Sequence, residues 1–257
     1  MINSTQELLK YKLPIFELFK NCFGSVIDEE LWQWAYISNP NGNPIISLYF
    51  DGEKLVGHYA VIPISFIYKN KSLNGLLSMT TMVDIAYRKY GVFIDQANEV
   101  YSKANELGYK FVCGFPNKKS APGFKKRLNW ILEEDLYVAK LTYEELQNID
   151  KNTAFDTISY NTKEKENMKW RLSKPNQEYT KKNNNILKKF NNSYDIVFNG
   201  VDFSMLDENS QYNILLEGNQ DKHVDKKEFD YIFGYRLFDT SLEGIEFKKD
   251  LIMSDVF

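Results

Sequence analysis

Apolar side chains near the start of the chain recur at helical spacing. Residues 6–22 are predicted to form a helix because apolar side chains fall every three or four positions, at Leu9, Leu13, Phe16 and Phe19, with Phe23 directly after the range. Asp28 opens a second run that predicts a short helix carrying Trp32, Trp34 and Tyr36. The breaker sequence at residues 39–42, Asn-Pro-Asn-Gly, ends this helix.

The middle of the chain consists of apolar runs separated by turn residues. Residues 45–50 and 55–68 flank Asp51-Gly52, which predicts a hairpin of two strands. The following runs predict, in order, a third strand over residues 73–87, a helix over 92–107 closed by Gly108, a buried parallel strand over 109–115, and a helix over 120–130 with Pro122 in its first turn.

The last third of the chain has weaker patterning. Residues 144–166 are polar and predict a connector, and beyond them we expect strands over 185–190, 194–200 and 245–257 with a helical stretch over 203–216. The sequence around Trp34 resembles the sequence around Trp170, since each has a nearby Pro with Asn beside it. This similarity fits either two related halves or a shared loop chemistry.

Composition limits the function classes. The 257 residues are 43% hydrophobic and 15% aromatic, which is enough to bury a core. The net charge of −3 is spread evenly over both halves, so neither half has the basic excess that nucleic-acid binding needs. Two distant cysteines and two histidines offer no zinc-ligand spacing, so we expect no metal. The N-terminus lacks the layout of a signal peptide and no apolar run is long enough to span a membrane, so we expect a cytoplasmic protein with no membrane partner.

The segment from Met82 to Phe93 carries the candidate chemistry. It runs from a predicted strand through a short turn into a predicted helix, with Arg88 and Gly91 at the junction. A glycine here lets backbone N–H groups approach a ligand closely, and a helix N-terminus presents unpaired donors and a positive dipole end. We therefore expect an anion site, with a diphosphate as its ligand.

This segment resembles the acyl-CoA motif of the GNAT superfamily of N-acyltransferases, Val-x-Pro-x-Tyr followed by Arg-x-x-Gly-x-Gly/Ala. Val83, Tyr87, Arg88 and Gly91 match the motif, whereas Ile85 stands in place of Pro and Phe93 in place of the second small residue. Residues 55–63 resemble the family's hairpin strand, and residues 114–130 resemble its fifth strand and next helix. The resemblance covers residues 16–141.

The resemblance implies an α/β (α+β) fold, with a mixed, mostly antiparallel GNAT-type sheet flanked by helices. It implies an acyl-CoA-binding domain over residues 1–142 and a connector over 143–166. A smaller C-terminal α+β portion over 167–257 would complete the sheet, hold the acceptor, or form a second GNAT-like half.

The resemblance also implies a site for acetyl-CoA. The diphosphate, the pantetheine arm and the thioester would contact Met82, Val83, Arg88, Lys89, Tyr90, Gly91, Val92, Phe93 and Asn117, and the 3′-phosphate would meet Lys118, Lys119 and Lys125. The family frequently places a Tyr proton donor on the helix after the fifth strand, but the helix predicted here carries Phe124, which has no hydroxyl.

Catalytic and acceptor residues are less determined by the sequence. Asp84 is the first candidate for the general base and His58 the second, although an Asp at a strand end commonly makes a cap and a His within a hairpin commonly belongs to the core. Thr80 and Trp32 are candidates for acceptor binding. Cys113 lies in an apolar strand and is expected to be a buried hydrophobe.

These observations predict direct transfer of an acetyl group from acetyl-CoA to a primary amine. The acceptor would be a small molecule, and larger relatives of this kind suggest an amino-sugar nucleotide for surface polysaccharide. The alternatives are an Eis-like amine or antibiotic acetyltransferase and a non-catalytic acyl-CoA-binding module. A tRNA-dependent aminoacyl transferase needs a tRNA-facing surface, which the balanced charge argues against.

Overall fold

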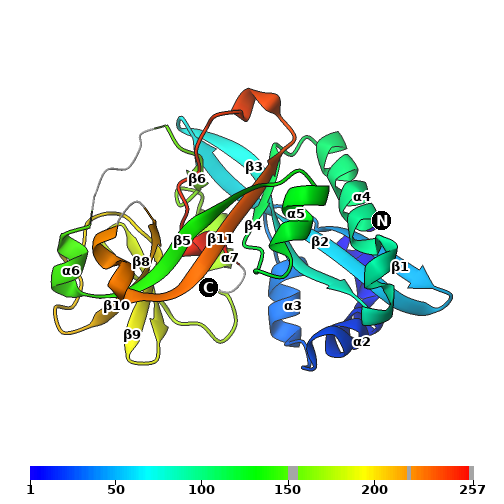
Figure 1. Ribbon diagram of the computed structural model, residues 1–257, viewed down its shortest axis with the longest axis horizontal. Coiled ribbons are helices and arrows are strands. Elements are labelled where there is room, and N and C mark those ends of the chain that lie inside the picture. Colours follow the sequence, from blue (N-terminus) through cyan, green and yellow to red (C-terminus); the bar gives the residue numbers. More distant parts are fainter. Residues whose placement is uncertain (150–155, 219–220, 255–257) are drawn as a thin grey trace.

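The computed structural model describes residues 1–149, 156–218 and 221–254 (Figure 1). The α-helices are α1 Thr5–Leu9, α2 Lys12–Phe23, α3 Glu29–Tyr36, α4 Val92–Glu106, α5 Ala121–Arg127, α6 Tyr143–Gln147 and α7 Lys165–Arg171, and the 3-10 turns are η1 Ile85–Tyr90, η2 Asp221–Lys226, η3 Thr240–Leu242 and η4 Leu251–Met253. The strands are β1 Ile45–Asp51, β2 Lys54–Tyr68, β3 Lys71–Val83, β4 Phe111–Gly114, β5 Ile131–Thr142, β6 Ser159–Tyr160, β7 Tyr179–Lys182, β8 Asn185–Phe190, β9 Ser193–Phe198, β10 Gln211–Glu217 and β11 Lys227–Leu237.

These strands form one mixed sheet in the order β1-β2-β3-β4-β11-β5-β10-β9-β8-β7, and β6 pairs with β2 beside it. The pairs β3–β4 and β9–β10 are parallel, and the other pairs are antiparallel. The predicted fold class, a mostly antiparallel sheet flanked by helices, is confirmed. None of the described helices is both long and apolar enough to cross a membrane.

The N-terminal elements follow the sequence pattern closely. The hairpin turns at Gly52-Glu53, one residue beyond the expected Asp51-Gly52, because Asp51 pairs with Lys54. The Asp28 side chain caps α3 by accepting the N–H groups of Glu30 and Leu31. The helix expected over residues 6–22 is instead two helices, α1 and α2, which meet at Tyr11. The strand expected over residues 73–87 ends at Val83, because η1 begins soon after it.

The two faces of the N-terminal sheet carry different helices. Successive residues of β2 alternate between two cores: Tyr59 and Val61 face α4, and Ala60 and Ile62 face the other side, where α2 packs. This alternation is the period of two that a strand imposes on its side chains. The sheet therefore has α4 on one face and α2 on the other, as the fold class requires.

Strands β5 and β11 join the two parts of the molecule. In Figure 1 they cross the middle of the view, with α2 to α5 to their right and β8, β9 and β10 to their left. Strand β11 lies between β4 and β5, so a segment near the end of the chain is inserted beside the N-terminal strands. One apolar core continues across both parts, from Trp34 through Phe233 to Val197.

Two predictions for the C-terminal part are wrong. Residues 203–216 are not helical, since β10 occupies Gln211–Glu217 and its alternating residues Tyr212, Ile214 and Leu216 share one core. Residues 245–254 form no strand beyond a single bridge from Phe247 to Ile158, and η4 buries three consecutive apolar side chains. All three side chains lie in the same core, whereas a strand would place consecutive side chains on opposite faces. Residues 255–257 of the expected strand lie outside the described part of the chain.

The segment expected as a connector contains short elements of its own. Helix α6 lies at its start, β6 pairs with β2 in its middle, and α7 begins at its end. Residues 150–155 of this segment lie outside the described part of the chain. The division of the chain into an N-terminal domain, a connector and a C-terminal portion stays a prediction.

The two segments that resemble each other in sequence pack together. The Trp34 and Trp170 rings stack with centroids 4.8 Å apart, and each indole Nε1–H donates to the other residue's carbonyl oxygen at 2.8 Å. This contact is locally symmetric and ties α3 to α7 across 136 positions of sequence. That the C-terminal portion is a second GNAT-like half stays a prediction.

Replacement of Trp170 by Ala should separate α3 from α7. The substitution removes a buried ring and leaves the Trp34 indole without its stacking partner, so we expect the free energy of unfolding to fall by about 3–5 kcal/mol. Equilibrium unfolding in urea measures this, with Phe190→Ala as the control because Phe190 is 50% exposed. Equal losses in the two variants would contradict the proposed importance of the contact.

Candidate active site

Strands β3 and β4 part soon after they meet. They pair only from Gly75–Phe111 to Leu77–Cys113, and beyond these residues the two backbones no longer pair. A cleft opens between them and has two adjoining pockets that share part of their lining. The strand pocket, about 340 Å³, is lined by Phe19, Phe23, Ser78, Met79, Thr80, Thr81, Gly114, Phe115, Pro116, Asn117, Ser120, Phe124 and Trp130. The loop pocket, about 590 Å³, is lined by Cys22, Phe23, Thr81, Met82, Val83, Arg88, Phe93, Asn117, Lys119, Ser120 and Gly123.

A bulge in β3 helps to form this cleft. The register between β2 and β3 shifts between His58 and Ala60, and Thr80 has a φ of +51°, which a β-branched residue rarely adopts. His58 Nδ1 lies 2.8 Å from the Thr80 carbonyl oxygen, which can only accept, so the ring nitrogen is the donor. The bulge brings Thr80 and Thr81 to the cleft lining instead of leaving them in regular pairing with β2.

His58 itself is fully buried and lies outside the cleft lining. Burial lowers its pKa from the usual 6.5 to about 4, with the hydrogen bond to Thr80 acting in the opposite direction. The ring is therefore neutral near pH 7, and its position fits support of the bulge better than direct contact with a substrate.

The turn before α4 presents the N-terminus of that helix. Asp84 caps η1 by accepting the N–H of Ala86 at 3.0 Å, and its other oxygen pairs with Lys54 at 2.7 Å. The Lys54 ammonium and the Ala86 N–H both lower the pKa of Asp84. Gly91 then has a φ of +79°, and its carbonyl accepts the N–H groups of Ile94 and Asp95, which starts α4.

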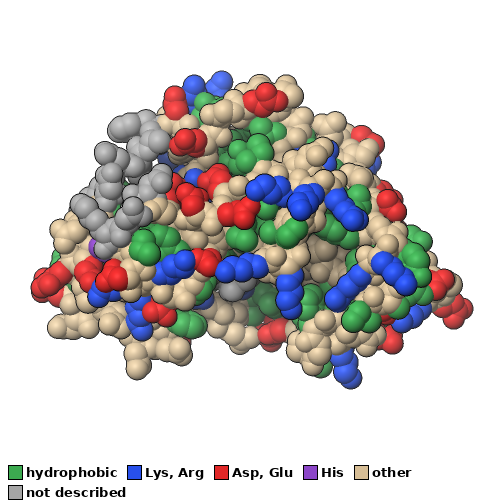
Figure 2. All heavy atoms as spheres, viewed as in Figure 1, with side chains coloured by type: hydrophobic (Ala, Val, Ile, Leu, Met, Phe, Trp, Pro, Cys, Tyr) green, Lys and Arg blue, Asp and Glu red, His purple; other side chains and the backbone are tan. Residues whose placement is uncertain are grey.

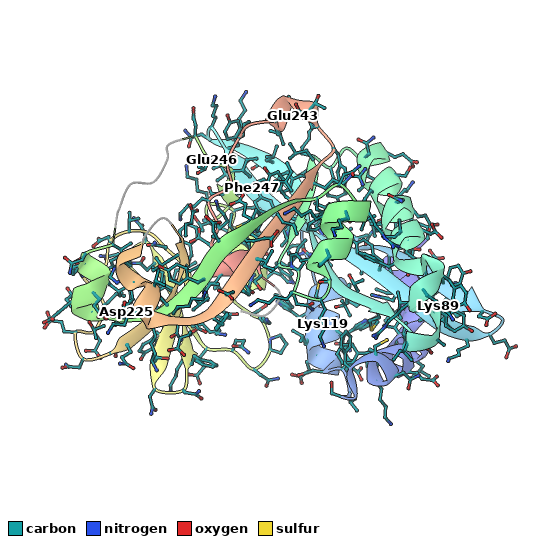
Figure 3. All side chains as sticks on the ribbon, in the orientation of Figure 1. Lys89, Lys119, Asp225, Glu243, Glu246 and Phe247 are labelled. Atoms are coloured by element: carbon teal, nitrogen blue, oxygen red, sulfur yellow. The ribbon has the colours of Figure 1, made fainter. Side chains whose placement is uncertain are left out.

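Cations lie on both sides of the loop pocket. Arg88 Nε donates to the Val83 carbonyl at 3.1 Å, which holds the guanidinium at the pocket wall. Lys89, on the turn before α4, and Lys119, on the turn before α5, are labelled in Figure 3. Figure 2 shows further Lys and Arg side chains over α5, whose last turn carries Lys125, Lys126 and Arg127. An anionic ligand in this pocket would therefore meet positive charge.

Two of the lysines expected at the 3′-phosphate form ion pairs within the protein. Lys118 Nζ lies 2.7 Å from an Asp230 oxygen, and Lys125 Nζ lies 2.8 Å from a Glu134 oxygen. Both ammonium groups are exposed, and exposed ion pairs contribute little to stability. A phosphate could therefore replace either carboxylate at small cost, and the role of these lysines stays a prediction.

The structure brings several sequence-predicted residues to the cleft. Those that line it are Met82, Val83, Arg88, Phe93, Asn117 and Thr80. Asn117 Oδ1 accepts the N–H groups of Lys119 and Ser120, which fixes the start of α5. Gly91 lies on the adjoining turn with Lys89 and the exposed Tyr90.

Other predicted residues lie away from the cleft lining. Trp32 is in the core against Phe16, with ring centroids 5.6 Å apart, and Val92 is buried at the start of α4. Asp84 is held in the cap described above, and Cys113 is the buried hydrophobe expected, with burial raising the pKa of its thiol.

The sequence analysis did not identify the contribution of α2. Phe23 lines both pockets, and Cys22 lines the loop pocket beside Arg88. These residues are far from the end of β3 in sequence, and no local pattern connects them with the motif. In the described part of the chain, no three His, Cys, Asp or Glu side chains are grouped so that they could hold a metal ion.

Comparison with known proteins finds one matching family model and several solved structures of similar fold. A family model described as an acetyltransferase (GNAT) domain matches residues 11–132, and no curated protein matches the chain. A probable N-acyltransferase from Enterococcus faecalis V583 is similar with a TM-score of 0.61 and 10% identity, over 90% of this chain and 71% of that one. A GCN5-related N-acetyltransferase from Anabaena variabilis has a TM-score of 0.59 and 8% identity, over 95% and 74%. Another from Kribbella flavida has a TM-score of 0.58 and 10% identity, over 93% and 72%.

His58 should make the fold sensitive to acid. An unfolded His binds a proton near pH 6.5, whereas the buried ring binds one only near pH 4, so the stability it supplies is complete above pH 6.5 and is lost as the pH falls toward 4. In His58→Asn, whose amide can still donate to Thr80, the loss between pH 7 and about pH 4.5 should be about 2 kcal/mol smaller than in the wild type. Urea unfolding at the two pH values measures the difference, and equal losses would contradict it.

Proposed function

Because this chain belongs to the GNAT superfamily of acetyltransferases, through residues 11–132, it is an acyltransferase, and we propose that it transfers an acetyl group from acetyl-CoA directly to a primary amine. One observation carries the proposal. The cleft between the parted strands β3 and β4 adjoins the turn at Gly91 that starts α4. A long substrate with a diphosphate at one end and a thioester at the other fits such an arrangement.

The loop pocket is the proposed donor site. The N–H groups of Val92 and Phe93 at the start of α4 and the Arg88 and Lys119 side chains would supply donors and positive charge for the diphosphate. The pantetheine arm would pair with the backbone of Met82 and Val83 as an added strand, since β4 no longer pairs with β3 there. A pocket of about 590 Å³ has the size usual for a small-molecule site.

The strand pocket is the proposed place of reaction. The amine nitrogen attacks the thioester carbonyl carbon, the C–S bond then breaks with its electron pair going to sulfur, and the amine nitrogen gives a proton to water. Backbone N–H groups along the bulged part of β3 would stabilise the oxygen of the intermediate. Five of the thirteen residues that line this pocket are aromatic, among them Phe19, Phe115 and Trp130, and these rings would exclude water around the reacting atoms.

The acceptor class is the finer part of the proposal. An amino-sugar nucleotide is the first acceptor to test, an aminoglycoside tests the Eis-like alternative, and thiol release from acetyl-CoA reports the reaction in both. Binding of acetyl-CoA without thiol release in the presence of either amine would favour the non-catalytic acyl-CoA-binding module instead.

A charge placed at Gly91 should abolish donor binding. In Gly91→Glu a carboxylate faces the proposed diphosphate position, so we expect the Kd for acetyl-CoA, measured by calorimetry, to rise about 100-fold or more. Gly108→Glu is a matched control at the other end of α4, because Gly91 and Gly108 have φ values of +79° and +81° and open space where a Cβ would lie. The control should bind within about threefold of the wild type. Equal weakening in both variants would assign the effect to backbone strain.

Asp84→Asn separates two roles of Asp84. An Asn keeps the oxygen that caps the Ala86 N–H but cannot act as a base, so the variant tests the carboxylate alone. The ion pair with Lys54, the lowered pKa and the position outside both pocket linings favour the role of a cap. We therefore expect kcat within about threefold of the wild type, measured by thiol release, whereas a loss of about 100-fold would identify Asp84 as the base.

A further inference from the structure

Four side chains form a hydrogen-bonded network beneath the strand pocket. Ser78 of β3 and Tyr59 of β2 have their hydroxyl oxygens 3.0 Å apart, and the Tyr59 and Tyr101 hydroxyls are 2.8 Å apart. Trp130 Nε1–H donates to the Tyr101 hydroxyl at 2.9 Å. Tyr59, Tyr101 and Trp130 are buried, so only Ser78 of the three hydroxyl groups reaches the pocket lining.

This hydrogen-bonded network contains one donor hydrogen more than its internal hydrogen bonds use. Three hydroxyls and one indole supply four donor hydrogens for three bonds. If Ser78 donates to Tyr59, as in the structure, a tyrosine hydrogen in the core has no acceptor among the described residues. If Tyr59 donates to Ser78 instead, every buried group is satisfied and the spare hydrogen belongs to Ser78. Hydroxyl hydrogens rotate freely, and an unsatisfied buried donor is costly, so the second arrangement is favoured whenever an acceptor occupies the pocket.

The strand pocket offers a place for such an acceptor. Ser78 comes directly after the last residue of β3 that pairs with β4, and Phe124 lines the same pocket without a hydroxyl. The residues that line this pocket, all within the described part of the chain, carry no charged side chain. A negative charge that develops here therefore depends on neutral donors.

We propose that Ser78 donates a hydrogen bond to the sulfur of the leaving CoA thiolate, with Tyr59, Tyr101 and Trp130 holding the Ser78 hydroxyl in the donating orientation. This inference rests on the proposed function. As the C–S bond breaks, its electron pair goes to sulfur, and the hydrogen bond from Ser78 stabilises the thiolate. Ser78 keeps its proton, and water protonates the thiolate after release.

The surroundings of the hydrogen-bonded network argue against transfer of a proton from the network to the thiolate. A relay from Tyr59 or Tyr101 would leave a tyrosinate in the core, and burial raises the pKa of Tyr59 to about 12 and that of Tyr101 well above its usual value. The Arg236 guanidinium, 4.9 Å from the Tyr101 ring, opposes this effect of burial without cancelling it. The hydrogen-bonded network is therefore suited to donate a hydrogen bond through Ser78 and not to lose a proton.

Free CoA is the probe that tests this inference without a known acceptor. The thiol of CoA bound to each protein is titrated by the ultraviolet absorbance of the thiolate. A hydrogen bond from Ser78 to the thiolate lowers the titration midpoint, so the midpoint in Ser78→Ala should lie about one pH unit above that of the wild type. Arg88 and Lys119 lie along the neighbouring loop pocket in both proteins, so their effect on the thiol cancels in the comparison.

Two further variants complete the test. Tyr59→Phe removes the group that donates to Ser78, and its midpoint should lie between those of the wild type and Ser78→Ala. Ser72→Ala is the matched control, since Ser72 is at the other end of β3 and outside both pockets, and it should titrate as the wild type does. Equal midpoints in Ser78→Ala and the wild type would overturn the role of Ser78 while CoA binding still supports the proposed function. Absence of CoA binding in the wild type would overturn both.

Discussion

The parting of β3 from β4 is the constraint on which the cleft depends. Two parallel strands normally continue to pair, because each unpaired backbone group costs a hydrogen bond. Here pairing stops after Leu77 and Cys113, and the bulge at Thr80 changes the course of β3. The unusual Thr80 backbone is held by His58 from β2, which is itself in the core. The open edge is thus stabilised by packing that lies outside the cleft.

Elements around the open edge give the cleft its chemical character. The turn capped by Asp84 brings the N-terminus of α4 to one end, where Arg88 adds positive charge. Aromatic side chains line the other end, where the hydroxyl of Ser78 is connected to the buried tyrosines. Charge therefore lies toward the loop pocket, and apolar surface with neutral donors lies toward the strand pocket. This gradient matches a substrate with a phosphorylated end and a reacting thioester end.

The second part of the chain is structurally continuous with the first. Strand β11 supplies the second neighbour of β4, on the side away from β3, and the stack of Trp34 on Trp170 joins α3 to α7. Burial of Trp34, Phe233 and Val197 in one core means that the strands around the cleft share their packing with the C-terminal part. A substitution far from the cleft in sequence can thus change the positions of β4 and the residues that follow it.

The sequence by itself determined the elements that local patterning controls. Apolar runs on either side of a turn predicted β1 and β2, helical spacing predicted α4, and the spacing of Arg88 and Gly91 predicted the turn beside the loop pocket, because each depends on neighbours along the chain. Only the tertiary structure decided the place of β11, the contribution of Phe23 and the burial of Trp32 and His58. These depend on contacts between residues far apart in sequence, and local spacing does not specify which distant surface covers a side chain. The same reason explains the failure at residues 203–216, where pairing with β5 and β9 favours a strand over a helix.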